Sequence, residues 1–221
     1  IYTHAGQEIG VASTKNFLAQ LTCIYLFTAY LSYLKWSISD EQLNQMVQHL
    51  NKIPEYIEYI LNQEETIKKI AKKYYKSNQF IFIGRGVNYP SALEGALKLK
   101  EISYIHATGY PAGELKHGPI ALIDESLPVV SICPKSDTYE KMISNIQEVK
   151  ARKGKIISIA TEGDETIKEF SDDVIYIPDV PEDLSPILVA VPLQLLSYHI
   201  AVLLNCNVDQ PRNLAKSVTV E

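Results

Sequence analysis

The spacing of hydrophobic residues divides the chain into two parts that meet near residue 79. In the first part, apolar side chains recur every three or four residues, which is the period of one helix face. Helices are predicted at 14–35, 39–51, 54–61 and 64–75. The first of these is apolar almost throughout, so we expect it to be buried rather than to lie at the surface, with Ser13 as its N-cap.

In the second part, short runs rich in β-branched residues alternate with helical segments. Strands are predicted at 80–83, 128–133, 155–160 and 173–178. Helices are predicted from Ser91 onward, at 140–153 with Gly154 as C-cap, and at 185–206. Continuous apolar strands between helices are typical of a parallel sheet covered on both faces. The predicted fold class is α/β, a three-layer αβα arrangement with a parallel sheet flanked by helices, preceded by a helical N-terminal segment.

The helix that begins at Ser91 carries three charged residues on one stripe. Glu94, Lys98 and Glu101 are spaced four and three residues apart, so each lies about one turn from the next. The core face is expected on the other side, formed by Ala92, Leu93, Ala96, Leu97 and Leu99. The stripe has two interpretations. It is either a solvated ladder of ion pairs, which spacing alone favours, or an acid/base site, since a lysine keeps nearby carboxylates ionised and carboxylates move protons.

The loop Gly84–Pro90 is the first candidate binding segment. It follows a predicted strand of a parallel sheet, and ligands of such sheets bind at the carboxyl ends of the strands. Gly84 and Gly86 permit close approach of backbone to a ligand, and the helix N-terminus at Ser91 offers free amides to an anion or a sugar oxygen. Tyr89 stands where a dinucleotide fingerprint needs its third glycine, so a dinucleotide cofactor is not expected.

Two further residues are candidates for chemistry near loops. His117 lies beside a Gly-Pro turn and suits either proton transfer near neutral pH or a structural role in the turn. Lys216 lies on the polar tail 209–221, where a lysine is either solvated or able to form a Schiff base with a carbonyl substrate. His199, inside the last apolar helix, is expected to be packed in the core.

Composition narrows the class of partner. The chain has 221 residues, a net charge of −5 and no basic block, which argues against a nucleic-acid partner. Its cysteines, Cys23, Cys133 and Cys206, are scattered, which argues against a zinc site and fits reduced thiols in a cytoplasmic protein. The apolar run 21–34 is interrupted by polar residues and is expected to be too short to span a membrane. We therefore expect neither a membrane partner nor a metal or organic cofactor.

Three separated strings carry a resemblance to a known family. LEGALKLKEISYIHA at 93–107, AGELKHGP at 112–119 and DQPRNLAKSVTVE at 209–221 strongly resemble glucosamine-6-phosphate synthases, the isomerising glutamine–fructose-6-phosphate aminotransferases. AGQEIGVASTK at 5–15 is similar as well, so the resemblance covers the whole chain. The family has a glutaminase domain followed by two sugar-isomerase (SIS) modules. The resemblance therefore implies an SIS-type fold and an enzyme of amino-sugar biosynthesis, on the pathway to UDP-N-acetylglucosamine.

The resemblance also implies a domain division and a set of partners. Residues 1–36 correspond to the remnant of the first SIS module and an interdomain helix, 37–208 to the second module, and 209–221 to a catalytic tail. The glutaminase domain and most of the first module are absent from this sequence. The implied reaction converts fructose 6-phosphate and glutamine-derived ammonia to glucosamine 6-phosphate in a homodimer.

Residue roles follow from the matched positions. Glu101 is the implied base that moves a proton between C1 and C2 of the sugar, Lys98 its neighbouring lysine and Glu94 a supporting carboxylate. His117 is implied to assist ring opening across the dimer interface, and Lys216 to form an imine with the open-chain ketose. Two backbone contacts to the sugar are implied at Val11 and Ala215.

One departure from the family bears on activity. The hydroxyl-rich loop that grips the phosphate belongs to the first module, and the segment Gly84–Pro90 has too few Ser and Thr residues to replace it. Without this remote binding energy to orient the sugar, we expect the isolated chain to have little or no synthase activity. Two other interpretations stay open, a non-catalytic SIS module that binds an amino-sugar phosphate and a structural dimerisation module.

Overall fold

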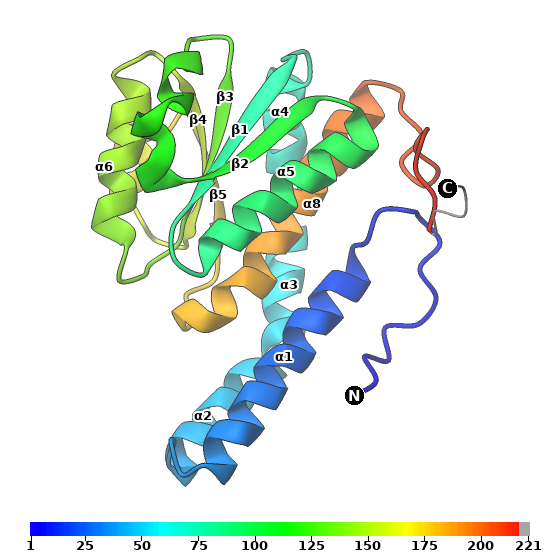
Figure 1. Cartoon of the computed structure of the whole chain (residues 1–221), viewed down its shortest axis with the longest axis vertical. Coiled ribbons are helices and arrows are strands. Elements are labelled where there is room, and N and C mark those ends of the chain that lie inside the picture. The colour runs from blue at the N-terminus through cyan, green and yellow to red at the C-terminus, as the bar shows by residue number, and fades with distance from the viewer. Residues whose placement is uncertain (217–221) are drawn as a thin grey trace.

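Five parallel strands form a single sheet in the computed structural model, which describes residues 1–216 (Figure 1). The order across the sheet is β2-β1-β3-β4-β5. The strands are β1 (Gln79–Gly84), β2 (His106–Pro111), β3 (Pro128–Cys133), β4 (Lys155–Thr161) and β5 (Asp173–Ile177). All neighbouring pairs are parallel. The predicted fold class is confirmed.

Helices cover both faces of the sheet, as the continuous apolar strands predict. They are α1 (Lys15–Leu34), α2 (Asp40–Asn51), α3 (Ile53–Leu61), α4 (Glu64–Tyr74), α5 (Asn88–Ser103), α6 (Tyr139–Lys150), α7 (Thr166–Phe170) and α8 (Ser185–Leu203). On one face, Phe80 and Phe82 of β1 pack in a core with α4, α5 and α8. On the other face, Ile81 and Ile83 pack with α6 and with the short 3-10 helix η1 (Ala112–His117). Successive side chains of β1 point to opposite faces of the sheet and thus belong to two separate cores.

The starts of the first two helices differ in how they are capped. Ser39 caps α2 with a reciprocal capping box to Gln42. The predicted cap of α1 is wrong by one residue, since Thr14 and not Ser13 stands at the N-cap position, and its own side chain makes no cap hydrogen bond. Instead, the backbone N–H of Thr14 donates to Glu8 Oε1 at 2.8 Å. A carboxylate six residues earlier therefore receives the N–H at this helix end.

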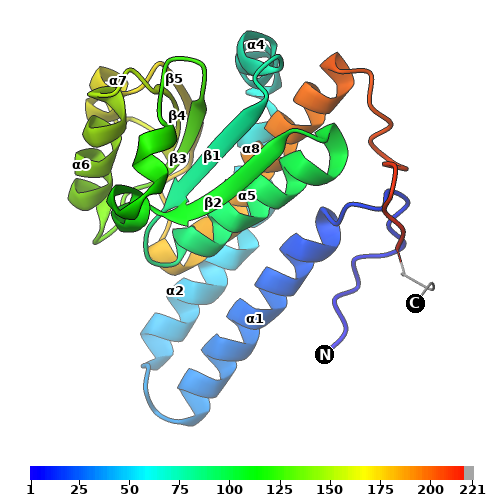
Figure 2. The ribbon, with the colours of Figure 1, turned by 45° about the horizontal axis from the view of Figure 1, so that its top comes forward.

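The burial predicted for α1 is wrong. Only Tyr25 and Ala29 are buried, while Ile24, Tyr30 and Leu34 are exposed. The helix contacts α2 and α8 and runs away from the sheet, as both views show (Figures 1 and 2). An apolar composition predicts that a helix needs cover, but α2 and α8 cover only one of its sides.

Two helical stretches within the described residues are long and apolar enough to cross a bilayer, Lys15–Leu34 and Glu182–Leu203. The expectation that the first is too short to span a membrane is therefore wrong, because α1 has 20 residues and extends beyond the run 21–34. The second is mostly buried, because α8 is the helix that α3, α4 and α5 pack around. His199 lies buried in α8, as predicted.

The segment around α5 departs from the predicted boundaries. The helix starts at Asn88 rather than Ser91, because the backbone turns directly after β1. A Cβ on Gly84 would lie 2.3 Å from the carbonyl oxygen of Asn88, so only glycine permits this turn. Strand β2 and helix α7 were not predicted. Gly109 and Pro111 weaken the strand pattern of β2, which forms at the sheet edge, where proline is tolerated.

The end of α6 shows a similar correction. The helix ends at Lys150, and its C-cap is Ala151 rather than Gly154. The residue with positive φ is Lys153, at 64°. Gly154 is needed for space instead, since an added Cβ would lie 2.6 Å from Val149 Cγ1.

Candidate functional site

The orientation of α5 is different from the one that its pattern predicts. Ala92, Ala96 and Leu99 are buried as expected, but Leu93 and Leu97 are each 42% exposed. The charged stripe lies on a side where the fold covers it, and the side chain of Lys98 is only 4% exposed. The interpretation of a solvated ladder is therefore wrong for this stripe.

Lys98 holds a carboxylate on each side. Its Nζ donates to Glu101 Oε2 at 2.6 Å and lies 3.6 Å from Glu94 Oε1. The side chains of Glu101 and Glu94 are 22% and 12% exposed. Because an ammonium in this position offsets the charge of both acids, the two carboxylates can sit close together away from bulk water.

Glu94 is the carboxylate of this group whose charged form the surroundings disfavour. Burial raises its pKa, the Lys98 ammonium opposes that effect, and the Glu101 carboxylate adds to it. The net direction is upward. No hydrogen bond reaches Glu94 Oε1 from any of residues 1–216. Glu94 thus supports Lys98 from a position that disfavours its own charge.

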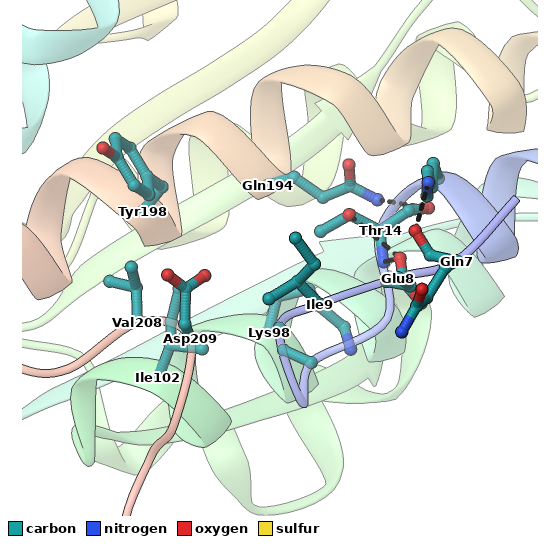
Figure 3. Close-up of a pocket in the computed structure, with 13 residues that line it drawn as sticks. Gln7, Glu8, Ile9, Thr14, Lys98, Ile102, Gln194, Tyr198, Val208 and Asp209 are labelled. Atoms are coloured by element: carbon teal, nitrogen blue, oxygen red, sulfur yellow. Dashed lines mark hydrogen bonds between the residues drawn. The ribbon is translucent and has the colours of Figure 1, made fainter. Parts of the chain in front are cut away.

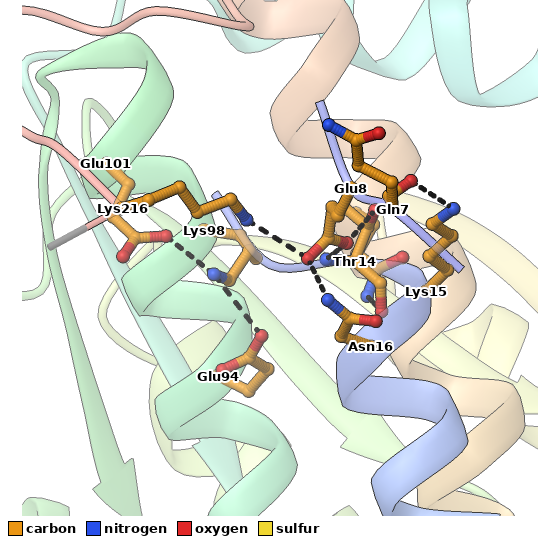
Figure 4. Close-up of polar contacts among 10 residues, drawn as sticks. Gln7, Glu8, Thr14, Lys15, Asn16, Glu94, Lys98, Glu101 and Lys216 are labelled. Atoms are coloured by element: carbon orange, nitrogen blue, oxygen red, sulfur yellow. Dashed lines mark hydrogen bonds and ion pairs between the residues drawn. The ribbon is translucent and has the colours of Figure 1, made fainter. Parts of the chain in front are cut away.

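A second charged group forms where the two ends of the described chain meet. Glu8 accepts hydrogen bonds from the Thr14 backbone N–H and hydroxyl, from Asn16 Nδ2 at 2.8 Å and from Lys216 Nζ at 3.2 Å. Burial raises the pKa of Glu8, but these bonds outweigh it and lower the pKa to about 2. The Glu8 side chain is 6% exposed, so a fixed negative charge faces Lys216 (Figure 4).

Both charged groups border one cavity of about 320 Å³ (Figure 3). Its lining comes from the N-terminal segment, α5, α8 and the start of the tail: Gln7, Glu8, Ile9, Gly10, Ala12, Thr14, Lys15, Lys98, Ile102, Gln194, Tyr198, Val208 and Asp209. Val11, flanked by lining residues, donates its backbone N–H to the Asp209 carbonyl at 2.9 Å. Ala215 is exposed and directly precedes Lys216.

The remaining predicted residues lie at the other end of α5. The helix begins beside the carboxyl end of β1 and ends before the amino end of β2, so Lys98 lies toward the amino edge of the sheet. Gly84, Gly86 and Ser91 lie at the carboxyl edge, and none of them lines the cavity. The structure does not bring this loop together with the charged groups.

His117 also stands apart within this chain. It ends η1, which follows the carboxyl end of β2, and its side chain is 63% exposed. Its Nε2 lies 3.8 Å from Glu114 Oε2. No hydrogen bond or ion pair among residues 1–216 joins it to Lys98, Glu101 or Lys216.

The arrangement offers a lysine on a tail and a carboxylate fixed by a second lysine. Their partners, Glu8 for Lys216 and Lys98 for Glu101, both line the cavity. An amine of this kind attacks a carbonyl, and a carboxylate of this kind moves a proton between adjacent carbons. No group of three or more His, Cys, Asp or Glu residues in the described chain is arranged to hold a metal ion.

Sequence reasoning missed Glu8, Gln194 and Asp209 as members of the site. Glu8 lies in the AGQEIGVASTK string that carries the family resemblance, which was the available signal. Gln194 is one polar residue in an apolar helix, and Asp209 opens the tail. Their proximity depends on contacts between segments that are far apart in the sequence.

Comparisons with known proteins agree with the resemblance. A family model described as SIS domain matches residues 73–204. Glutamine–fructose-6-phosphate aminotransferases [isomerizing] from Chlorobaculum tepidum and from Thermus thermophilus are each 54% identical over the whole chain. The chain spans 36% and 37% of their lengths, about a third of each relative.

Solved structures extend this likeness to the fold. The C-terminal domain of glucosamine-fructose-6-phosphate aminotransferase from Francisella tularensis matches with a TM-score of 0.87 and 42% identity. The match covers 93% of this chain and 58% of that one. A tagatose-6-phosphate ketose/aldose isomerase from Escherichia coli, at 18% identity and a TM-score of 0.71, shares the fold.

Proposed function

The chain belongs to the SIS domain family, and on this premise we propose that it is the C-terminal isomerase part of a glutamine–fructose-6-phosphate aminotransferase. The observation that carries the proposal is one cavity lined both by Glu8, which binds Lys216, and by Lys98, which binds Glu101. The names of relatives at 54% identity support the substrate, fructose 6-phosphate, and the product, glucosamine 6-phosphate.

The first step that we assign is imine formation. Lys216 Nζ first releases its ammonium proton to water and then attacks C2 of the open-chain ketose, a C–N bond forms, and the carbonyl oxygen leaves as water. Ammonia then adds to the same carbon and Lys216 departs as a free amine. Proximity of the tail lysine to the cavity supports this role, since Glu8, its partner, lines the cavity wall.

The second step is the proton transfer that completes the isomerisation. Glu101 removes a proton from C1 and returns it to C2, while the C1 hydroxyl proton passes to the nitrogen. The products are an aldehyde at C1 and an amine at C2. Lys98 keeps the Glu101 carboxylate oriented through the 2.6 Å hydrogen bond, and Glu94 supports Lys98 from the other side.

The rest of the site comes from outside this chain in the proposal. We assign ring opening to His117 of a second copy, because the histidine of the same chain lies at the opposite edge of the sheet. We also assign the phosphate grip to a first SIS module and the ammonia to a glutaminase domain. Sugar contacts at Gly84, Gly86 and Ser91 stay predictions, as do those at Val11 and Ala215, the domain division, the homodimer and the cytoplasmic location.

Replacement of Glu101 in the full-length protein tests this function. Glu101→Gln keeps the shape and the hydrogen bond but removes the base, so we expect the formation of glucosamine 6-phosphate to fall by about a hundredfold or more. Binding of the sugar phosphate, measured by calorimetry, should persist. Unchanged turnover would exclude the assignment, and a wild-type protein that binds the sugar without turnover would favour the non-catalytic module.

A further inference from the structure

The tail that carries Lys216 has no helix or strand over residues 209–216, yet several hydrogen bonds attach it to the body of the protein. The Asp209 carbonyl accepts the Val11 N–H at 2.9 Å, the Arg212 N–H donates to Tyr104 Oη at 2.7 Å, and Lys216 Nζ contacts Glu8 Oε2 at 3.2 Å. We propose that Tyr104 and Glu8 are positioning residues that dock this tail and thereby place Lys216 at the cavity.

Tyr104 ties the tail to the helix that carries the proposed base. It is the C-cap of α5, three residues after Glu101, and has a positive φ of 64°. Its phenol oxygen accepts the Arg212 N–H, and its ring lies 4.3 Å from the Arg212 guanidinium carbon. The two contacts use different parts of one side chain, so both the backbone and the side chain of Arg212 are attached to the end of α5.

Glu8 fixes the other end of the tail. Its carboxylate is oriented independently of Lys216, because Thr14 and Asn16 at the start of α1 donate three hydrogen bonds to it. Oε2 then accepts from both Asn16 and Lys216. Because the acceptor is already oriented, only the lysine side chain loses conformational entropy when the contact forms.

Neither residue is assigned contact with the reacting atoms of the sugar. The inference rests on the proposed function, because Lys216 matters to the reaction only if it forms the imine. Docking then raises the fraction of molecules in which Nζ faces C2, which changes the rate of imine formation more than the affinity for the sugar. Loss of docking should therefore lower kcat with little change in KM.

The test traps the imine in the full-length protein. Borohydride and fructose 6-phosphate are added, and mass spectrometry follows a secondary amine at Lys216. We expect Glu8→Gln, which loses a charge-assisted hydrogen bond, to slow trapping by about tenfold or more. Tyr104→Phe, which keeps the ring and loses the acceptor, should slow it by about fivefold. Glu8→Asp should recover part of the rate, and Glu55→Gln, an exposed acid on α3, serves as the control.

A readout independent of activity separates this inference from the proposed function. Hydrogen exchange at the Arg212 amide should accelerate in Tyr104→Phe and stay unchanged in the Glu55→Gln control. Trapping and exchange rates equal to those of the wild type in both docking variants would overturn the positioning role. If the wild type forms no adduct at Lys216, the proposed imine is wrong, and the exchange rates alone then decide whether Tyr104 docks the tail.

Discussion

Lys98→Met measures how much the ion pairs of the charged stripe on α5 contribute to the free energy of unfolding. Methionine has a similar length and no charge, so the change removes the ammonium that lies between Glu94 and Glu101 while it keeps most of the packing. The structure leaves no other hydrogen bond or ion pair within residues 1–216 for Glu101. Two carboxylates would then face each other with no cation between them.

The expected loss follows from burial. Removal of one partner from a buried ion pair costs about 3–5 kcal/mol, because the other charge stays desolvated. The Glu101 side chain is 22% exposed and that of Glu94 is 12% exposed, so water compensates in part. We therefore expect the free energy of unfolding to fall by about 3 kcal/mol at pH 7.

Urea denaturation of this chain measures the loss, with an unchanged m-value as the check that the unfolded state is the same. The matched control is Lys100→Met, an exposed lysine on the same helix, which should change stability by less than about 0.5 kcal/mol. Without the ammonium, the folded-state pKa of Glu94, which burial already raises, should rise further. The folded variant then binds protons that the unfolded chain does not, so its deficit should shrink as the pH falls toward 4.5.

Two results would refute this reasoning. A loss below about 1 kcal/mol at pH 7 would mean that water reaches the carboxylates freely. A deficit that stays the same between pH 7 and pH 4.5 would mean that lost packing, rather than uncompensated charge, causes the destabilisation.

Three further predictions concern single residues. Because burial raises the folded pKa of Glu94, its charge costs stability as the pH rises above about 4.5, so Glu94→Gln should stabilise the chain against urea at pH 7 and have no effect at pH 4. The pKa of Glu8 is lowered from 4.5 to about 2, which corresponds to a stabilisation of the folded state by at most about 3 kcal/mol. Solvent near Lys216 screens the interaction and reduces this stabilisation to about 1–2 kcal/mol. This contribution is complete above pH 4.5 and disappears as the pH falls to 2, so acid titration followed by circular dichroism should show a flatter profile for Glu8→Gln. Gly84→Ala places a Cβ 2.3 Å from the Asn88 carbonyl oxygen and should lower the melting temperature through a loss of about 1–3 kcal/mol, whereas Gly163→Ala, with open space around it, isolates the smaller cost of its positive φ.

Local patterns predicted most of the elements. β1, β3 and β4 are continuous apolar runs, and the capping box of α2 needs only residues 39 and 42. β2 escaped prediction because its glycine and proline give it little strand propensity of its own. Its hydrogen bonds to β1 stabilise it, and such pairing is not visible in a local window.

The orientation of elements was harder to predict than their existence. The spacing of Glu94, Lys98 and Glu101 fixes that they share a stripe, but not whether solvent or protein faces it. The structure covers that stripe and exposes Leu93 and Leu97, the reverse of the usual amphipathic arrangement. A charged stripe that is buried is also the physical reason to suspect chemistry there. For α1, composition predicted an apolar helix correctly and its burial wrongly.

The contact between Glu8 and Lys216 joins residues separated by 208 positions. Because a chain is synthesised from its N-terminus, this contact is among the last that can form, after Lys216 has left the ribosome. A product that stops a few residues early, or whose tail a protease has clipped, would keep the sheet and both cores and yet lack Lys216, the nucleophile that we propose. Assays of solubility would therefore miss such damage, whereas the intact mass of the polypeptide would report it.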